Sequence, residues 1–146
     1  MELALKNFPK GLSILVAKDP YKAYARIANK FYQPVLGSGD IHPTAVISPK
    51  AKLGKNPSIG PYVVIEENVV VGDNCIIGPH SYLNRAVKLG ADCRLGAGVV
   101  LSFCHIGDNV FIHNGVKIGQ DGFGFAPDPV QHVKIPQLGR VIIGSN

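Results

Sequence analysis

Charged residues are scarce in this chain: Asp, Glu, Lys and Arg together make up 17% of its 146 residues, whereas 46% of the residues are hydrophobic. Disordered chains show the opposite balance, so this composition favours a folded domain. No apolar run is long enough to cross a membrane, and residues 1–11 lack the hydrophobic stretch of a signal peptide. We therefore expect a folded cytoplasmic protein with no membrane span.

Cysteines are also few, and basic residues do not cluster. The three cysteines are an odd number, which argues against the disulfide framework of a secreted domain. The net charge is +5, but Lys and Arg are scattered and do not alternate with aromatic residues, which argues against binding of nucleic acid. This diffuse charge fits either an ordinary, slightly basic enzyme surface or a surface for an acidic carrier protein or an anionic nucleotide sugar.

What the sequence does contain is a repeat of six residues. From Ile41 every sixth residue is Ile, Leu or Val, until the repeat shortens by one residue after Leu101 and resumes at Ile106, Ile112 and Ile118. A period of six matches neither a helix nor a simple strand, and predicts short strands separated by corners. Three such strands form one triangular coil of 18 residues, and the aliphatic side chains of successive coils stack in one core.

Two further columns support the repeat. Small or medium side chains lie four residues after each aliphatic position, and Cys75 and Cys93, which lie above one another in this scheme, should stack as buried, reduced thiols. Glycine often follows the aliphatic residue directly, as at Gly72 and Gly78, and asparagine often lies two residues further on. Gly and Asn both tolerate positive φ, so we expect both of them at tight corners.

Residues 1–40 lie outside the repeat. Residues 12–17 favour a strand, and Asp19 followed by Pro20 is a typical helix start. One strand and one helix cannot bury a core alone, so we interpret residues 1–33 as the tail of a larger N-terminal α/β domain. Residues 34–40 are interpreted as a linker, and residues 41–146 as the repeat domain.

The repeat is interrupted by a long loop over residues 119–142. An insertion of this length in a compact repeat is usually functional. Ile143 and Gly144 restart the repeat, and the chain stops at Asn146, one step into a new coil. Because an open coil edge exposes unpaired backbone groups, we interpret the C-terminus as artificial or truncated.

The loop and the N-terminal segment carry a specific resemblance to a known family. Residues 118–126 (IGQDGFGFA) and 134–144 (KIPQLGRVIIG) resemble the signature of the UDP-3-O-(3-hydroxyacyl)glucosamine N-acyltransferases. Residues 17–32 (AKDPYKAYARIANKFY) resemble the end of that family's uridine-binding domain. The resemblance implies an all-β fold, a left-handed parallel β-helix of hexapeptide repeats preceded by a strand and a helix, and a homotrimer. The left hand comes from the family and not from the periodicity.

The same resemblance implies a chemistry. Such an enzyme moves a 3-hydroxyacyl chain from the phosphopantetheine arm of acyl carrier protein to the amine of UDP-3-O-acylglucosamine in lipid A biosynthesis, with no bound cofactor. A histidine with a pKa near neutrality removes the proton from the amine. The family's histidine lies in a later motif resembling I-A-H-N-V-x-I-G, so we expect it beyond Asn146 and expect no catalytic residue in this chain.

Two histidine-based alternatives are less well supported. Residues 112–119 (IHNGVKIG) imitate the catalytic motif, but His113 lies one residue after the corner aliphatic where the family's histidine lies two, and it precedes the loop. We expect a solvated or interface histidine there, and a chain that is inactive by itself. In trimeric β-helices that bind Zn²⁺ through three histidines, two are five residues apart, whereas the closest pair here, His105 and His113, is eight apart. We therefore expect no metal.

The candidate substrate-binding residues all lie in the loop: Asp121, Phe123, Phe125, Lys134, Gln137 and Arg140. The first three are candidates for contact with a ligand or a neighbouring subunit, although a loop that packs on itself, with both Phe side chains against the β-helix, is an equal alternative. The last three could meet phosphate or the charges of the carrier protein, or form a plain solvated cluster.

Two other functions stay open. One is a different hexapeptide acyl- or acetyltransferase that uses coenzyme A or acyl carrier protein, which the signature loop argues against. The other is a catalytically silent β-helix that only trimerises or binds, which the absence of the histidine motif favours for this chain.

Overall fold

The computed structural model describes residues 11–32 and 37–145, and the chain divides into two units, Met1–Leu36 and Gly37–Asn146. In the first unit, α1 (Pro20–Phe31) begins as predicted, with Pro20 in the first turn and the Asp19 carboxylate accepting a hydrogen bond from the N–H of Lys22 at 3.0 Å. No residue of α1 is buried. In the described part of the chain, no helix is both long and apolar enough to cross a bilayer.

The strand expected over residues 12–17 is wrong. These residues form no strand and pair with no other strand among the described residues. A strand needs a neighbour to bond its N–H and C=O groups, and a β-rich sequence cannot supply that neighbour by itself. Residues 33–36, which include the start of the predicted linker, and residues 1–10 lie outside the described residues, so the assignment of an N-terminal domain tail stays a prediction.

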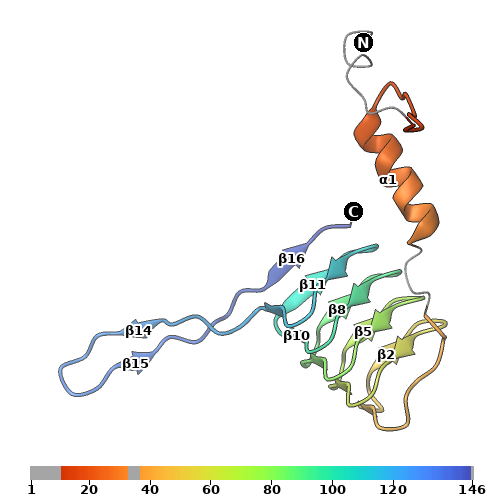
Figure 1. Cartoon of the computed structure of the whole chain (residues 1–146). Coiled ribbons are helices and arrows are strands. Elements are labelled where there is room, and N and C mark those ends of the chain that lie inside the picture. The colour runs from red at the N-terminus through yellow and green to blue at the C-terminus, as the bar shows by residue number, and fades with distance from the viewer. Residues whose placement is uncertain (1–10, 33–36, 146) are drawn as a thin grey trace. The chain divides into compact units, whose positions relative to one another are not determined.

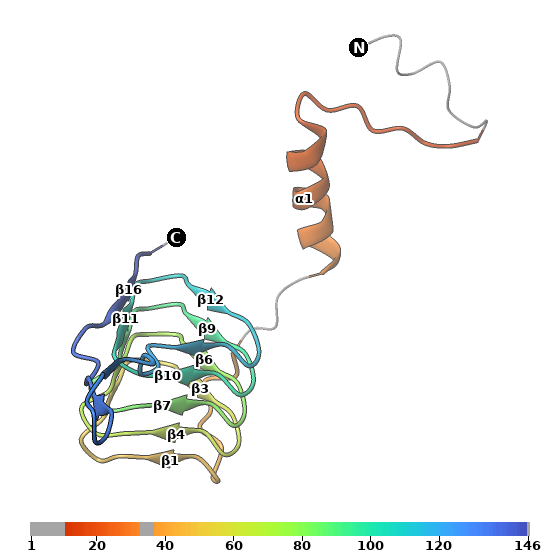
Figure 2. The ribbon, with the colours of Figure 1, turned by 90° about the vertical axis from the view of Figure 1, so that its left-hand side faces the viewer.

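The second unit is a left-handed parallel β-helix with three sheets, one on each face of a prism (Figures 1 and 2). The first face contains β1 (Val46–Ile47), β4 (Val64–Ile65), β7 (Tyr82–Leu83), β10 (Val100–Leu101) and β13 (Lys117–Ile118). The second contains β2 (Lys52–Leu53), β5 (Val70–Val71), β8 (Lys88–Leu89), β11 (Cys104–Ile106) and β16 (Val141–Ile143). The third contains β3 (Ser58–Ile59), β6 (Ile76–Ile77), β9 (Arg94–Leu95) and β12 (Phe111–Ile112).

The strand register follows the predicted repeat. Val46 pairs with Val64, and Val64 pairs with Tyr82, so equivalent residues of successive coils are 18 apart. The predicted shortening after Leu101 is confirmed, because the next partners are only 17 apart: Val100 pairs with Lys117. The corner between β10 and β11 therefore has one residue fewer than the corners below it.

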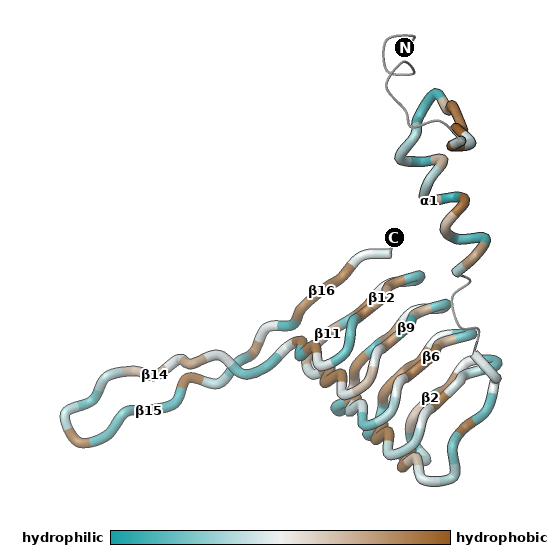
Figure 3. The backbone as a smooth tube through the Cα atoms, in the orientation of Figure 1, coloured by the Kyte–Doolittle hydropathy of each residue, from teal (hydrophilic) through white to brown (hydrophobic). Residues whose placement is uncertain are grey.

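The predicted core columns are confirmed. Ile59, Ile77 and Leu95 lie above one another in the third sheet and are at most 3% exposed. Figure 3 shows the matching hydrophobic stretches at β6, β9 and β12. Cys75 and Cys93 are free and fully buried, and each Sγ donates a hydrogen bond at 3.0 Å to a carbonyl of the coil above, that of Gly90 or Gly107. The core is thus a stack of small and aliphatic side chains.

At the corners, the prediction of positive φ is confirmed for asparagine but not for most of the glycines. Asn56, Asn68 and Asn74 have φ between 50° and 60°, as expected. The glycines that follow the aliphatic column mostly do not have positive φ, so their predicted role is wrong. A Cβ at Gly72 would lie 2.5 Å from the backbone N of Ala91, and these glycines are required because the next coil approaches too closely for a side chain.

The predicted loop forms a β-hairpin that extends away from the coils (Figure 1). Its strands β14 (Phe125–Ala126) and β15 (Val133–Lys134) are antiparallel, with Phe125 opposite Lys134. The chain then returns to the prism, where β16 pairs with β11. Since β16 begins at Val141, two residues that we assigned to the loop lie in a strand of the second face.

Candidate functional site

Four of the predicted loop residues come together on the hairpin. The Lys134 ammonium lies 3.0 Å from the Asp121 carboxylate and 5.4 Å from the centre of the Phe125 ring, so it makes an ion pair and a cation–π contact. It also donates hydrogen bonds to the carbonyls of Gly122 and Ile135, at 2.9 and 2.7 Å. Lys134 thus joins the two arms of the hairpin.

The two phenylalanines pack on each other and not on the prism. The rings of Phe123 and Phe125 meet edge to face, with their centres 5.1 Å apart. Phe123 is nevertheless 98% exposed, so the alternative in which both Phe side chains are pinned against the β-helix is wrong for Phe123. A solvent-exposed aromatic side chain on an ordered hairpin is suited to contact a ligand or another subunit.

Gln137 and Arg140 lie further along the returning arm. The Gln137 side chain lies beside Gly122 and Gly139, where added Cβ atoms would be 3.2 and 3.4 Å from it. Arg140 lies at the base of the hairpin and turns to the prism, where its Nη1 is 2.6 Å from Nε2 of His105 on β11. The six predicted residues therefore do not form one cluster, because Arg140 lies apart from the others.

An open hollow of about 530 Å³ lies at the base of the hairpin. It is lined by Glu66, Tyr82, Asn84, Arg85, Ala86, Phe103, Cys104 and Arg140. Both ends of the hairpin meet the shortened corner here: Gly119 lies against the carbonyl of Ser102, and the N–H of Val141 donates to the carbonyl of Phe103 at 2.8 Å. The hollow thus lies where the repeat loses a residue and where the insertion leaves and rejoins it.

Phe103 has a positive φ at this corner, as other corner residues of the β-helix have. Its φ is 40°, which is a rare value for a bulky residue, and its side chain is 50% exposed at the hollow. Backbone strain of this kind costs about 1–3 kcal/mol and persists only where the surrounding structure imposes it. The corner itself imposes the conformation here, because Ala86, the register equivalent of Phe103 one coil below, has a φ of 61°.

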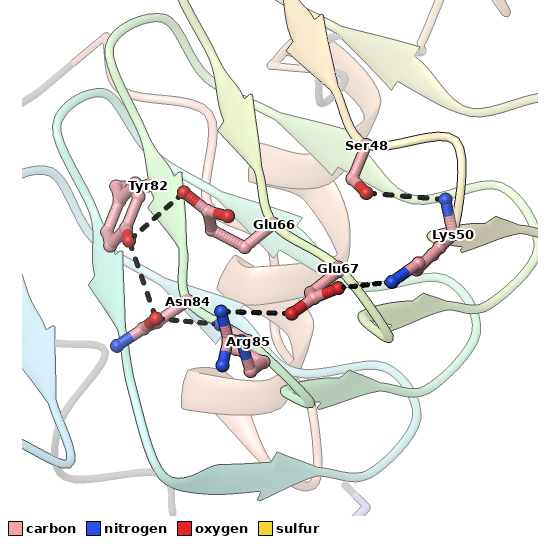
Figure 4. Close-up of polar contacts among 7 residues, drawn as sticks. All are labelled: Ser48, Lys50, Glu66, Glu67, Tyr82, Asn84 and Arg85. Carbon is pink, nitrogen blue, oxygen red and sulfur yellow. Dashed lines mark hydrogen bonds and ion pairs between the residues drawn. The ribbon is translucent and has the colours of Figure 1, made fainter.

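A polar network follows the same corner down the coils, as Figure 4 shows. The Tyr82 hydroxyl lies 3.4 Å from both Glu66 and Asn84, and Asn84 donates to the Ser102 hydroxyl at 3.3 Å. Partial burial, followed by the charge of Glu66 and its hydrogen bond, raises the pKa of Tyr82. Tyr82 is therefore a neutral hydrogen-bond donor at the wall of the hollow.

An exposed ion pair network adjoins it in Figure 4. Glu67 contacts both Lys50 and Arg85 at 2.9 Å. The hydrogen bond from Lys50 and the charges of Arg85 and Lys50 lower the pKa of Glu67. Two basic side chains line the hollow, those of Arg85 and Arg140. Arg85 forms an ion pair with Glu67, whereas Arg140 has no acidic partner among the described residues.

His105 is the histidine in contact with this site. Partial burial and the charges of Arg140 and Lys88 lower its pKa, so its ring is neutral and its Nε2 accepts from Arg140. By contrast, His113 is exposed, and its ring lies 4.5 Å from that of Phe111 on the third face. In the described part of the chain, no three metal-ligating side chains come together, and the prediction of no metal stays untested.

Sequence reasoning missed His105, Lys88, Phe103 and Tyr82. One signal could have found two of them: across the shortened corner Lys88 and His105 are 17 residues apart, which makes them register partners on one face. The contact with Arg140 could not have been found, because it depends on how the chain returns from a hairpin of unknown geometry.

The comparisons with known proteins first define the class. The profile of the bacterial transferase hexapeptide family, described as six repeats, matches residues 50–85 and 86–120, which include most of the β-helix. A solved structure of a UDP-N-acetylglucosamine acyltransferase from Bacteroides fragilis has a TM-score of 0.57 and 27% identity, over 73% of this chain and 42% of that one. The chain is thus a hexapeptide-repeat β-helix of the transferase type.

Curated relatives identify the family within this class. The chain is 53% identical to UDP-3-O-acylglucosamine N-acyltransferase of Rhizobium johnstonii, 56% to that of Granulibacter bethesdensis, and 55% to UDP-3-O-acylglucosamine N-acyltransferase 2 of Legionella pneumophila. The alignments cover 94%, 92% and 97% of this chain and 41%, 40% and 41% of those proteins. The chain therefore belongs to this family, and spans about two-fifths of the length of these relatives.

Proposed function

We propose that this chain functions in an N-acyltransferase reaction, which moves a 3-hydroxyacyl chain from acyl carrier protein to UDP-3-O-acylglucosamine in lipid A biosynthesis. The observation that carries the proposal is the identity of 53–56% to enzymes of that name over at least 92% of the chain. Because they leave at most 8% of the chain unaligned, these alignments include most of the segment between β13 and β16, which interrupts the hexapeptide repeat.

The proposed reaction needs no bound cofactor. The amine nitrogen of the glucosamine attacks the thioester carbonyl, a base takes the proton from that nitrogen, and the C–S bond breaks to release the phosphopantetheine thiol of the carrier protein. Hairpin residues Asp121, Phe123 and Lys134 would contact the substrate or the neighbouring subunit. Their support is the exposure of Phe123 beside an ordered ion pair.

We propose that the base is not His113. Its ring is exposed on the third face and contacts Phe111, and neither residue lines the hollow at the base of the hairpin. A general base must come within hydrogen-bond reach of the amine, and the hairpin and the hollow are the better candidates for holding the substrate. In the motif of the family that the sequence resembles, the histidine lies two residues after the corner aliphatic, whereas His113 directly follows Ile112.

The proposed assembly is a cytoplasmic homotrimer that binds acyl carrier protein. Each outer face of the prism carries an exposed apolar side chain, namely Val46, Ile142 or Phe111, which is at least 61% exposed. Such residues favour burial against a second subunit. The three cysteines are free and buried, which fits a reducing compartment.

The test uses the protein as the organism makes it, together with 3-hydroxyacyl carrier protein and UDP-3-O-acylglucosamine. We expect transfer of the acyl group to the amine, detected by mass spectrometry, and an unchanged rate in His113→Ala. Absence of transfer in the wild-type protein would refute the activity. Loss of transfer in His113→Ala, with an unchanged melting temperature, would refute our placement of the base.

A further inference from the structure

The second face of the prism carries three nitrogen-bearing side chains in contact or in register. Lys88 on β8 and His105 on β11 are register partners, so both side chains project from the same side of the sheet, one coil apart. Arg140, just before β16, places its guanidinium 2.6 Å from the ring of His105. An arginine only donates, so the neutral ring holds this guanidinium in one orientation.

No acidic side chain compensates these charges. Among residues 11–32 and 37–145, no carboxylate lies within ion-pair distance of Arg140 or Lys88. Burial lowers the pKa of His105, and the charges of Arg140 and Lys88 lower it further. Two cations near one imidazole, without a carboxylate, give a local positive field that an anion can neutralise.

The hollow lies directly beside this cluster, because Arg140 lines it. Its other charges are already occupied: Arg85 pairs with Glu67, and Glu66 lies against the Tyr82 hydroxyl. The rest of the wall offers the half-exposed ring of Phe103 and the amide of Asn84. A ligand with one anionic end and one organic end matches this arrangement.

We propose that Arg140, His105 and Lys88 bind a phosphate group. The organic part attached to that group lies in the hollow, against Phe103 and Tyr82. The guanidinium fork suits two phosphate oxygens, and the ammonium of Lys88 contributes a point charge. The inference rests on the proposed function only for the source of the phosphate, which is either the nucleotide diphosphate of the sugar substrate or the phosphodiester of phosphopantetheine.

The binding test follows the ring signals of the histidines by NMR in the 146-residue chain, with the His105 signal assigned from its loss in His105→Asn. Inorganic diphosphate, UDP and 4′-phosphopantetheine are titrated separately. We expect a saturable shift of the His105 signal and a rise in the pKa of His105 with bound ligand, because a nearby negative charge favours the imidazolium. A linear, unsaturated shift at millimolar concentrations of all three ligands would overturn the proposal.

Two variants distinguish a specific phosphate-binding site from a diffuse attraction by the positive surface. Arg140→Gln should weaken binding about tenfold or more, as expected for a lost charge-assisted hydrogen bond. Lys52→Gln is the matched control, since Lys52 lies on β2 of the same face, two coils below Lys88. It should change affinity less than about twofold at moderate salt. Equal weakening by both variants would overturn the proposal.

A third variant tests whether the organic part of the ligand lies in the hollow, and identifies the source of the phosphate. Phe103→Ala should weaken binding of UDP or of 4′-phosphopantetheine, whichever binds more tightly, and leave inorganic diphosphate unchanged. An equal effect on all three ligands would overturn the placement of the organic part. These measurements need no turnover, so a failure of phosphate binding is distinguishable from a failure of the proposed acyl transfer.

Discussion

The close approach of successive coils at Gly72 allows a sharp test of the fold. A Cβ added there would lie 2.5 Å from both the backbone N of Ala91 and the backbone C of Gly90, whereas ordinary contact begins at 3.4 Å. Backbone atoms cannot rotate away as a flexible side chain does. Gly72→Ala must therefore separate two coils locally by about 0.9 Å, the difference between these two distances.

The magnitude follows from what that separation disturbs. The N–H of Gly72 donates to the carbonyl of Leu89 at 2.8 Å, and a displacement of this size stretches the bond beyond useful length. Overpacking of a well-packed interior costs about 1–3 kcal/mol. For a domain of this size, each kcal/mol lowers the melting temperature by about 4 °C. We expect Gly72→Ala to melt roughly 4–12 °C below the wild type.

The same corner supplies a matched control. Gly144 occupies the equivalent position above Gly107, and nothing lies within 4 Å of a Cβ added to it. In the 146-residue chain, Gly144→Ala should leave thermal unfolding, followed by circular dichroism, within about 2 °C of the wild type. Gly72→Asn adds a second discrimination: a glycine required for positive φ would tolerate Asn, whereas one required for space would not.

The reasoning would be refuted if Gly72→Ala melted with the wild type, or if Gly72→Asn were the milder of the two changes. Either result would mean that the corner needs conformational freedom and not the absence of a side chain. A destabilisation equal to that of Gly144→Ala would indicate a general effect of replacing glycine, unrelated to the distance between coils.

Two further predictions concern polar and thiol groups inside the prism. Ser81→Ala should lower the free energy of unfolding in urea by about 1–3 kcal/mol, because the buried N–H of Val99 loses its acceptor at 3.2 Å. Ser81→Cys should retain more stability, since cysteine fills the same column at Cys75. An equal loss of stability in both variants would contradict this role of the hydroxyl. The thiol of Cys104, whose pKa burial raises to about 11, should react with a disulfide reagent at neutral pH only after unfolding; rapid reaction in the folded chain would show that it is accessible.

The repeating part of the fold could be predicted from the sequence because one physical rule recurs at every coil. An inward aliphatic residue at each sixth position specifies strand, corner and register together, and even the shift at Leu101 was visible as a missing residue. The hand of the β-helix was not visible in this pattern and came only from the family resemblance. Periodicity gives the spacing of the strands and leaves the direction of winding open.

The wrong predictions share a cause: each concerned an interaction between segments and not within one. Residues 12–17 have strand propensity but no partner among the described residues. The glycine column is set by the neighbouring coil, which a local preference for positive φ does not describe. The contact of Arg140 with His105, 35 residues away, likewise could not be predicted, and the assignment of Arg140 to substrate binding stays a prediction.

The regular repeat and the two breaks in it determine where a binding site can form on such a prism. A regular β-helix repeats the same flat outer face, so outward side chains stay parallel and do not converge on a ligand. Convergence needs a break in the repeat. Here the shortened corner at Phe103 and the insertion that ends at Arg140 meet at one place, and together they bring Tyr82, Arg85 and Arg140 around one hollow. The positions that broke the six-residue pattern in the sequence are therefore the positions that make a concave, charged site in the structure.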